Sequence, residues 1–247
     1  MILYIQCGKS LYNKTMEEGT YNWSPQRYID LVEHTSNPML KDFQEQEITY
    51  ITSAVANPQD KVFIDIGAGY GRVIPKLSDI ARQVIAIEID AQMLSELNKK
   101  TLQHNNLTVI SGDVNNLSEL LSDSTVDSPV FLVLQNSFGT WKGDYKKALD
   151  QIRQIAQEKN GEIIISLFAQ EGLKEFGIPM YEGIKELVGD PDLNRVDFEK
   201  GDFYSKTGYY SHWWRPEERQ EMISTLGGKL IGEVKNSSFH IFHISYS

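Results

Sequence analysis

Three acidic side chains are the residues of this sequence best suited to bind a ligand. Asp65, Glu88 and Asp113 each stand at the end of a short apolar run that predicts a buried parallel strand. Open α/β sheets bind their ligands at the carboxyl ends of such strands. A carboxylate there can accept strong hydrogen bonds from hydroxyl groups of a ligand. We therefore expect one ligand site at this edge of the sheet.

A loop with alternating glycines follows Asp65 directly. Gly67, Gly69 and Gly71 remove every second side chain, so the backbone can turn tightly and lie against a bound molecule. The dinucleotide-binding fingerprint G-x-G-x-x-G would need a glycine where the sequence has Arg72. The loop alone is also compatible with a structural turn or another nucleotide site, so the neighbouring strand-end acids decide its interpretation.

The order of these motifs resembles the class I S-adenosylmethionine-dependent methyltransferases. The resemblance rests on the pattern Asp65-x-Gly67-x-Gly69-x-Gly71 and on the acids at 88 and 113. It implies S-adenosylmethionine as the cofactor, with the Asp113 carboxylate on the adenine amino group and the next backbone N–H on a ring nitrogen. The implied cofactor-binding residues are Asp65, Gly67, Ala68, Gly69, Gly71, Glu88, Ile89, Asp113, Val114 and Gln135.

A fourth apolar run ends in the amide-rich turn Gln135-Asn136-Ser137-Phe138. The resemblance places this turn beside the reactive methyl group, and the turn is similar to the corresponding segment of small-molecule N-methyltransferases. Methyl transfer from a sulfonium is an in-line displacement, so positioning the acceptor does most of the work. We expect an amine nitrogen of a small molecule as the acceptor, with Asn136 as a positioning residue.

Two aromatic segments are candidates for the substrate side of the site. Residues 203–214 hold six aromatic side chains and His212, and further aromatics lie near the start of the chain. Such rings can shield a reacting sulfonium from water, although ordinary packing is the alternative. His212 is the candidate general base for an acceptor that arrives protonated, with a structural histidine as the alternative. The predicted substrate-side residues are Tyr21, Trp23, Tyr28, Asn136, Ser137, Phe138, Tyr209, Tyr210, His212 and Trp213.

Alternating strands and helices predict a doubly wound, mostly parallel α/β sheet. We expect helices at residues 25–35, 38–56, 71–81, 90–103 and 142–158 and from Pro216 onward, with a closing hairpin of strands. The resemblance implies seven strands in the order 3-2-1-4-5-7-6, the last antiparallel. The expected single methyltransferase domain consists of a helical N-terminal lid or extension (1–60), a cofactor-binding core (61–169), a substrate-side insertion (170–214) and a C-terminal helix and hairpin (215–247).

Composition bounds the partners and the location. The 34 acidic and 24 basic residues give a net charge of −10, which predicts that a phosphate backbone is repelled and that nucleic acid is not a partner. Cys7 is the only cysteine, which excludes disulfides within the chain and thiolate zinc clusters. The apolar residues 1–6 are too short for a signal peptide or a membrane span, so we expect a soluble cytoplasmic protein with no membrane partner. The oligomeric state is left open.

We also expect that no metal takes part. Metal-assisted O-methyltransferases gather carboxylates around the substrate, whereas the turn after the fourth strand offers Gln135 and Asn136 with no acid before Asp144.

Four alternatives stay open at this point. An O-methyltransferase acting on a small hydroxylated metabolite would use His212, and a non-catalytic S-adenosylmethionine-binding module would share the loop. An NAD-dependent oxidoreductase is disfavoured by the glycine spacing. An aminopropyltransferase should carry an acidic gate where this sequence has Gln135-Asn136-Ser137.

Overall fold

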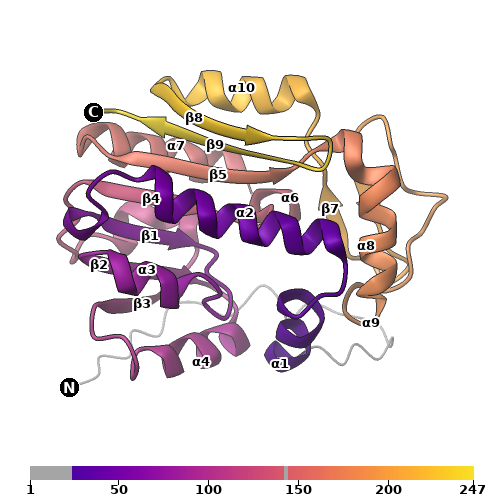
Figure 1. Cartoon of the computed structure of the whole chain (residues 1–247), viewed down its shortest axis with the longest axis horizontal. Helices are drawn as coiled ribbons and strands as arrows, with labels where there is room; N and C mark the ends of the chain where they lie inside the picture. Colours follow the sequence, from indigo (N-terminus) through magenta and orange to yellow (C-terminus); the bar gives the residue numbers. More distant parts are fainter. Residues whose placement is uncertain (1–23, 142–143) are drawn as a thin grey trace.

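The computed structural model of the chain describes residues 24–141 and 144–247 and is built around a seven-stranded sheet (Figure 1). The strand order is β3-β2-β1-β4-β5-β9-β8, which confirms the predicted order 3-2-1-4-5-7-6 because β6 and β7 form a separate two-stranded sheet. Strands β1 to β5 run parallel, and β9 is antiparallel to both β5 and β8. The bounds are β1 Val62–Ile66, β2 Gln83–Glu88, β3 Leu107–Ser111, β4 Pro129–Val133, β5 Glu162–Phe168, β8 Lys229–Lys235 and β9 Phe239–Ser245, with β6 Asp202–Tyr204 and β7 Tyr210–His212 in the small sheet.

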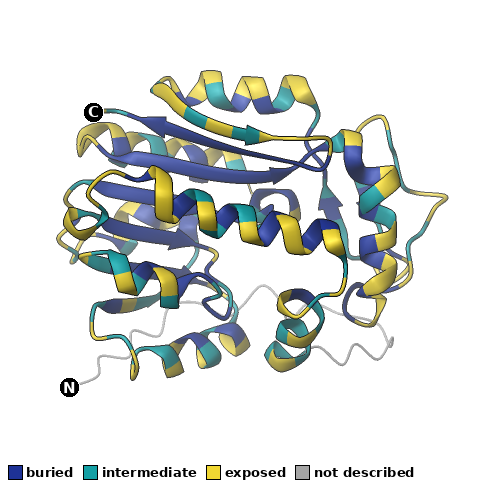
Figure 2. Cartoon of the chain, in the orientation of Figure 1, coloured by how far each residue is buried: buried dark blue, intermediate teal, exposed yellow. Residues whose placement is uncertain are grey.

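Helices cover both faces of the large sheet. Side chains of α2, α3 and α4 pack with Phe63 and Val130 on one face, while α5, α7 and α10 pack with Ile64 and Phe131 on the other. The helix bounds are α2 Pro38–Ala54, α3 Ile74–Ile80, α4 Ala91–Lys100, α5 Leu117–Leu120, α7 Tyr145–Glu158 and α10 Pro216–Leu226. Strands β1, β4, β5 and β9 are buried along their whole length, whereas β8 forms an exposed edge (Figure 2). Burial of alternate side chains on two faces is what a doubly wound sheet requires.

Local capping chemistry fixes where the helices begin. Ser24 and Asn37 each accept a hydrogen bond from a backbone N–H of the first turn and are followed by proline at the first helical position. Helix α3 begins three residues later than predicted because Gly71 has a φ of +82°, which is not helical. Helix α7 begins at Tyr145 because Asp144 is its N-cap.

Short elements gather beyond the carboxyl ends of the parallel strands, where Figure 1 shows α1, α8, α9 and β7. The structure places there α1 Pro25–Tyr28, the π turn η2 Ile29–Glu33, α6 Ser137–Thr140, α8 Ile178–Gly183, α9 Lys185–Val188 and the β6–β7 hairpin. The predicted helix at 25–35 is therefore a four-residue helix continued by η2. None of the described helices is long and apolar enough to span a lipid bilayer. The proposed division into functional segments stays a prediction.

Candidate active site

The glycine loop after β1 borders open space. Gly67, Gly69 and Gly71 all have positive φ, which side chains of L-residues rarely adopt. A Cβ added at Gly69 would meet nothing within 4 Å, whereas one at Gly71 would lie 2.6 Å from a methyl of Leu97 in α4. The first glycine is tied to the neighbouring strand, since its N–H donates to the carbonyl of Ile87 at 2.9 Å. The loop is therefore anchored to β2 at Gly67 and borders open space at Gly69, as a ligand-binding loop requires.

Glu88 at the tip of β2 is fixed against this loop. Its Oε2 accepts a hydrogen bond of 2.7 Å from the N–H of Gly69, and its Oε1 accepts from the N–H groups of Ile89 and Asp90 at 2.7 and 2.8 Å. The residue is 8% exposed, while the adjacent Ile89 is 49% exposed. Oε1 thus already accepts two hydrogen bonds, whereas Oε2 accepts one and keeps an acceptor site for a ligand hydroxyl. Asp90 caps α4 through its side chain.

Asp65 makes the cradle electronegative. It is 4% exposed, and burial raises the pKa of its carboxyl to about 7, with Arg72 lowering that value and Glu47 and Glu88 raising it. Three buried carboxylates thus face one guanidinium. A ligand with positive groups fits this field, and the cofactor that the resemblance implies carries a sulfonium and an ammonium.

Asp113 lies at the tip of the third strand. Its side chain accepts a hydrogen bond of 2.9 Å from the N–H of Asn115 and so caps the short helix η4 Val114–Asn116. The end of β3 is held next to the second strand tip, because the N–H of Gly112 donates to the carbonyl of Glu88 at 3.0 Å. The structure therefore brings the three predicted acids to one edge of the sheet.

The turn after β4 has an unusual backbone. Gln135 and Asn136 both adopt the left-handed conformation, with φ of 52° and 57°. Such conformations cost free energy in non-glycine residues and persist where surrounding contacts enforce them. Here the N–H of Gln135 donates to the side chains of Ser166 (2.9 Å) and Glu47 (2.6 Å).

Asn136 is a structural tie. Its side chain is fully buried, and its Oδ1 accepts from the N–H of Phe168 (3.1 Å) and from Nε1 of Trp214 (3.0 Å). Its Nδ2 donates to the carbonyl of His212 at 3.0 Å. The amide is thus occupied on both sides, and these contacts do not support its predicted role in positioning an acceptor.

The remaining predicted residues of this turn differ in how far they are buried. Phe138 is 3% exposed and packs against the rings of Trp141 and Tyr145, so it belongs to the core. Ser137 and Gln135 are half-buried. These two are the turn residues with surface to offer a ligand.

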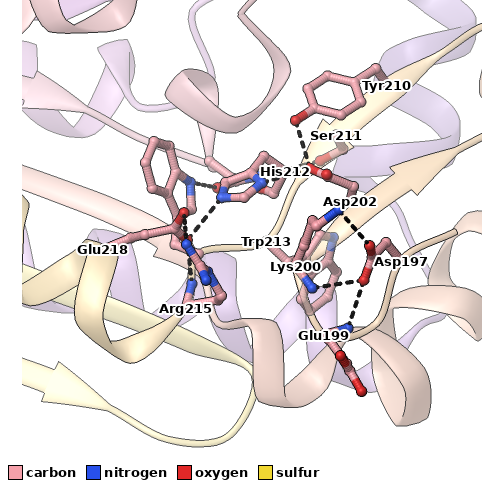
Figure 3. A network of polar contacts seen from close by, with 12 residues as sticks. Asp197, Glu199, Lys200, Asp202, Tyr210, Ser211, His212, Trp213, Arg215 and Glu218 are labelled. Carbon is pink, nitrogen blue, oxygen red and sulfur yellow. Dashed lines mark hydrogen bonds and ion pairs between the residues drawn. The ribbon is translucent and has the colours of Figure 1, made fainter.

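His212 is held between two carboxylates (Figure 3). Its Nδ1 lies 2.9 Å from Oδ1 of Asp202, and its Nε2 lies 3.1 Å from Oε2 of Glu218. Tyr210 donates to the same Asp202 oxygen, and the side chain of Arg215 donates to Glu218. Both ring nitrogens are thus occupied by carboxylate oxygens, and neither is left to contact an acceptor substrate. These contacts do not support the predicted role of His212 as a general base.

We expect His212→Phe to act on stability and to leave the pH dependence of any methyl transfer unchanged. The change removes two charge-assisted hydrogen bonds and should lower the free energy of unfolding by about 1–3 kcal/mol, measured by urea denaturation. His240→Phe is a second buried histidine change, on β9, for comparison. If only the His212 variant lost one limb of the pH–rate profile, His212 would be the general base after all.

The aromatic insertion is mostly core. Trp213 and Phe203 are fully buried; the first stacks on Phe168 at 4.6 Å and the second on Tyr181 at 3.7 Å between ring centroids. Trp213 also donates through Nε1 to the hydroxyl of Tyr181. Trp213 is therefore not a wall of an open pocket. Its neighbours Tyr209 and Tyr210 are half-buried, and β6 and β7 pair in a hairpin about residues 206–208.

The N-terminal side of the site is described in part. Tyr21 and Trp23, and Tyr12 upstream, lie outside the described residues. Tyr28 of α1 lies with its ring 6.0 Å from that of Tyr70 in the glycine loop, and burial raises its pKa to about 12. Arg27 of the same helix pairs with Glu186 of α9. The first helix therefore lies at the cradle, as predicted, and is joined to the insertion.

A buried cluster at the cradle was missed by sequence reasoning. Glu47 of α2 is fully buried and accepts hydrogen bonds from Nη2 of Arg72, from Oγ of Ser166 and from the N–H of Gln135. One signal was present: Phe43, Glu47 and Ile51 follow each other at four-residue spacing, so an acid stands in the apolar stripe of α2. Among the described residues, no group of three or more histidine, cysteine or acidic side chains is arranged to hold a metal, and the metal-free mechanism stays a prediction.

The family model described as ribosomal RNA adenine dimethylase matches residues 42–134. The probable ribosomal RNA small subunit methyltransferase A of Methanosarcina acetivorans is 36% identical over 63 residues, which are 26% of this chain and 23% of that protein. The ribosomal RNA small subunit methyltransferase A of Syntrophus aciditrophicus is 27% identical over 126 residues, 49% of this chain and 45% of that protein. The chain spans less than half the length of these curated relatives.

The solved structure of a SAM-dependent methyltransferase from Aquifex aeolicus is similar in fold. It superposes with a TM-score of 0.55 at 14% identity and covers 91% of this chain and 100% of that one. The family match ends at residue 134, directly before the turn at Gln135, so it covers the segment from α2 to the end of β4 and none of the insertion at 170–214.

These comparisons correct two predictions. The matching family model and both curated relatives are named for ribosomal RNA, so the small-molecule acceptor, on nitrogen or oxygen, and the exclusion of a nucleic-acid partner are wrong. Net charge misled because it sums the whole chain, whereas a phosphate meets only the cations near its binding surface. The predicted fold, enzyme class and cofactor are confirmed. The chain has the fold of the class I S-adenosylmethionine-dependent methyltransferases.

Proposed function

We propose that the protein transfers a methyl group from S-adenosylmethionine to a nitrogen of an adenine base in RNA, in the cytoplasm. One observation carries the proposal: the ribosomal RNA adenine dimethylase model matches the segment that builds the cradle, from α2 to β4. The strand-end acids, the open glycine loop and the electronegative field of the same segment support it.

In this proposal each cradle residue binds a different part of the cofactor. Glu88 binds the ribose hydroxyls, Asp113 and the backbone at Val114 bind the adenine ring, and Asp65 faces the positive end. When bound, S-adenosylmethionine supplies a methyl group on a sulfonium. The chain contributes by orientation and by exclusion of water, and an amine that arrives neutral needs no general base. The occupied ring nitrogens of His212 agree with this.

RNA phosphates would contact cations near the site, although the net charge of the chain is −10. Lys100, at the end of α4, lies 5.9 Å over the ring of Tyr70 in the glycine loop and takes part in no ion pair within the described residues. It is the described cation best placed to contact RNA at the cradle. Binding through such contacts weakens as salt rises.

The direct test is to incubate the protein with labelled S-adenosylmethionine and a cell extract separated into RNA, protein and small molecules. We expect label in RNA and, after nuclease digestion, on adenosine. Lys100→Glu should weaken RNA methylation without changing cofactor affinity, with Lys159→Glu, an exposed lysine at the end of α7, as the matched control. Label confined to protein or to small molecules would overturn the proposal.

Two changes in the cradle should weaken the cofactor. Gly69→Val places a side chain in the open space, and Glu88→Ala removes the strand-tip acceptor. Each should cost about 1–3 kcal/mol of binding free energy for S-adenosylmethionine and its demethylated product, measured by calorimetry. Asp90→Ala removes only a helix cap and serves as the control. Unchanged affinity in both cradle variants would remove the assignment of the site.

A further inference from the structure

The β6–β7 hairpin of the insertion has one buried face and one outer face. Phe203 and Ser211 stand opposite each other in the hairpin, and both are fully buried. Successive side chains of a strand point to opposite faces, so the next pair, Tyr204 opposite Tyr210, lies on the outer face. Both tyrosines are half-buried, and their ring centroids are 5.1 Å apart. The hairpin therefore presents two neighbouring aromatic rings on the side away from the core.

Arg195 adds a charged plane to these two rings. Its guanidinium carbon lies 4.4 Å from the centroid of the Tyr204 ring, and the residue is exposed. A guanidinium over an aromatic ring at this distance is attracted by the electron-rich face of the ring. Tyr204 contacts both of its partners and lies between them. We call Tyr210, Tyr204 and Arg195 the arginine–tyrosine cluster, and Arg195 is its exposed end.

Hydrogen bonds hold the arginine–tyrosine cluster in place. The hydroxyl of Tyr210 donates to Oδ1 of Asp202 at 2.8 Å (Figure 3). The N–H of Asp192 donates to the carbonyl of Tyr204 at 2.9 Å, and the N–H of Arg195 donates to the carbonyl of Asp192 at 2.8 Å. The loop that carries the arginine is thus tied to the strand that carries its ring partner. A planar group that is already fixed loses little entropy when a ligand binds.

The cluster lies near the turn after β4, on the acceptor side of the proposed site. His212 follows Tyr210 by two residues in β7, and its carbonyl accepts a hydrogen bond of 3.0 Å from Nδ2 of Asn136 in that turn. Two residues of a strand span about 7 Å. Figure 1 shows β7 next to α6, beyond the carboxyl ends of the parallel strands. RNA that brings a target adenine to the cradle therefore has neighbouring nucleotides within reach of the cluster.

We propose that the outer face of the Arg195 guanidinium, supported by the Tyr204 ring, stacks on an unpaired base that flanks the target adenine. Unpaired RNA bases are bound by stacking on arginine planes and aromatic rings. The N–H groups in the plane of the same guanidinium can donate to a phosphate. The family model ends at residue 134, so this contact belongs to the insertion and not to the matched segment. The inference rests on the proposed RNA substrate.

The test separates a stacking plane from a positive charge. Arg195→Lys keeps the charge and loses the plane, whereas Arg195→Trp keeps a plane and loses the charge. The substrate is ribosomal RNA, with labelled S-adenosylmethionine as the methyl donor. The lysine variant should raise the KM for RNA roughly 5- to 150-fold, the loss of one stacked base, and the tryptophan variant should stay within about threefold of the natural protein. The kcat should be unchanged in both, because the cluster does not contact the reacting atoms.

Tyr204 provides a second, independent comparison. Tyr204→Leu removes the ring beneath the guanidinium and should raise the KM for RNA, whereas Tyr204→Phe keeps the ring and should leave it unchanged. Arg82→Lys is the matched control, because Arg82 is exposed and pairs with Asp127 away from the insertion. Circular dichroism shows whether each variant is folded. If Tyr204→Leu does not fold, the two substitutions at the exposed Arg195 still decide the question.

Each contrary result has a distinct meaning. A natural KM in Arg195→Lys with a raised KM in Arg195→Trp would show a phosphate contact and overturn the stacking. Equal effects in the two variants, or none, would also overturn it, since a planar group would then confer no advantage. If the unaltered protein put no label into RNA, the proposed function itself would fail, and this inference with it.

Discussion

Replacing Glu47 by alanine should lower the free energy of unfolding by about 3–5 kcal/mol. The change leaves the guanidinium of Arg72 buried without its anion, and it removes an acceptor from Ser166 and from the N–H of Gln135. Removing one partner of a buried pair costs more than the pair contributes, because the other charge keeps its desolvation penalty. Urea denaturation followed by circular dichroism measures the loss.

The same helix provides the matched control. Glu45 lies two residues away, is exposed, and pairs only loosely with Lys41 at 4.0 Å. Glu45→Ala should therefore change the stability by less than about 1 kcal/mol. Equal effects of the two substitutions would mean that the buried cluster does not organise the cradle.

Replacing Asp65 by asparagine should raise the free energy of unfolding, whereas Glu47→Ala lowers it. Burial raises the pKa of this carboxyl from 3.8 to about 7, more than the charge of Arg72 lowers it. The folded protein then holds a proton that the unfolded chain releases, so the ionised form destabilises the fold. A shift of about three pKa units corresponds to roughly 4 kcal/mol, which is the upper limit of the stabilisation expected at pH 8 in the absence of cofactor.

The pH dependence separates this effect from packing. Below pH 4 both the folded and the unfolded forms are protonated and the penalty is absent; it grows as the pH rises from 4 to 7 and is complete above 7. Unfolding free energies of the natural protein should fall over this window, and those of the asparagine variant should fall less. Asp79→Asn, an exposed change in α3, is the control. A constant difference between the proteins at pH 4 and pH 8 would contradict the account.

The same variant should bind the cofactor more weakly. The ionised Asp65 favours a cationic ligand, so affinity for S-adenosylmethionine should rise with pH through the pKa near 7. The substitution is thus expected to raise stability and to lower cofactor affinity. A stabilised binding-site variant of this kind marks a residue kept for function.

The fold was predictable because its signals are local. Each strand is an apolar run, each begins or ends near a glycine, proline or acid, and the alternation with helices leaves few possible sheets. The acids Asp65, Glu88 and Asp113 could be placed at one edge because parallel strands share their carboxyl ends.

The interior of the site depends on contacts between distant residues. Glu47 lies 25 positions from Arg72, 88 from Gln135 and 119 from Ser166, and no local pattern encodes such a meeting. His212 similarly has the residue type of a general base, but two carboxylates ten and six positions away occupy it. The net charge of −10 is a sum over the whole chain, so it could not predict whether a nucleic acid binds near the site.

The measurement that tests the central claim most directly is equilibrium binding of labelled S-adenosylmethionine to the unaltered protein. The account predicts one site per chain, with label displaced by S-adenosylhomocysteine and retained in the presence of NADH. The Glu88→Ala variant should lose this binding in parallel. Displacement by NADH, or saturable binding that is identical in the variant, would show that the strand-end acids and the glycine loop serve a different ligand.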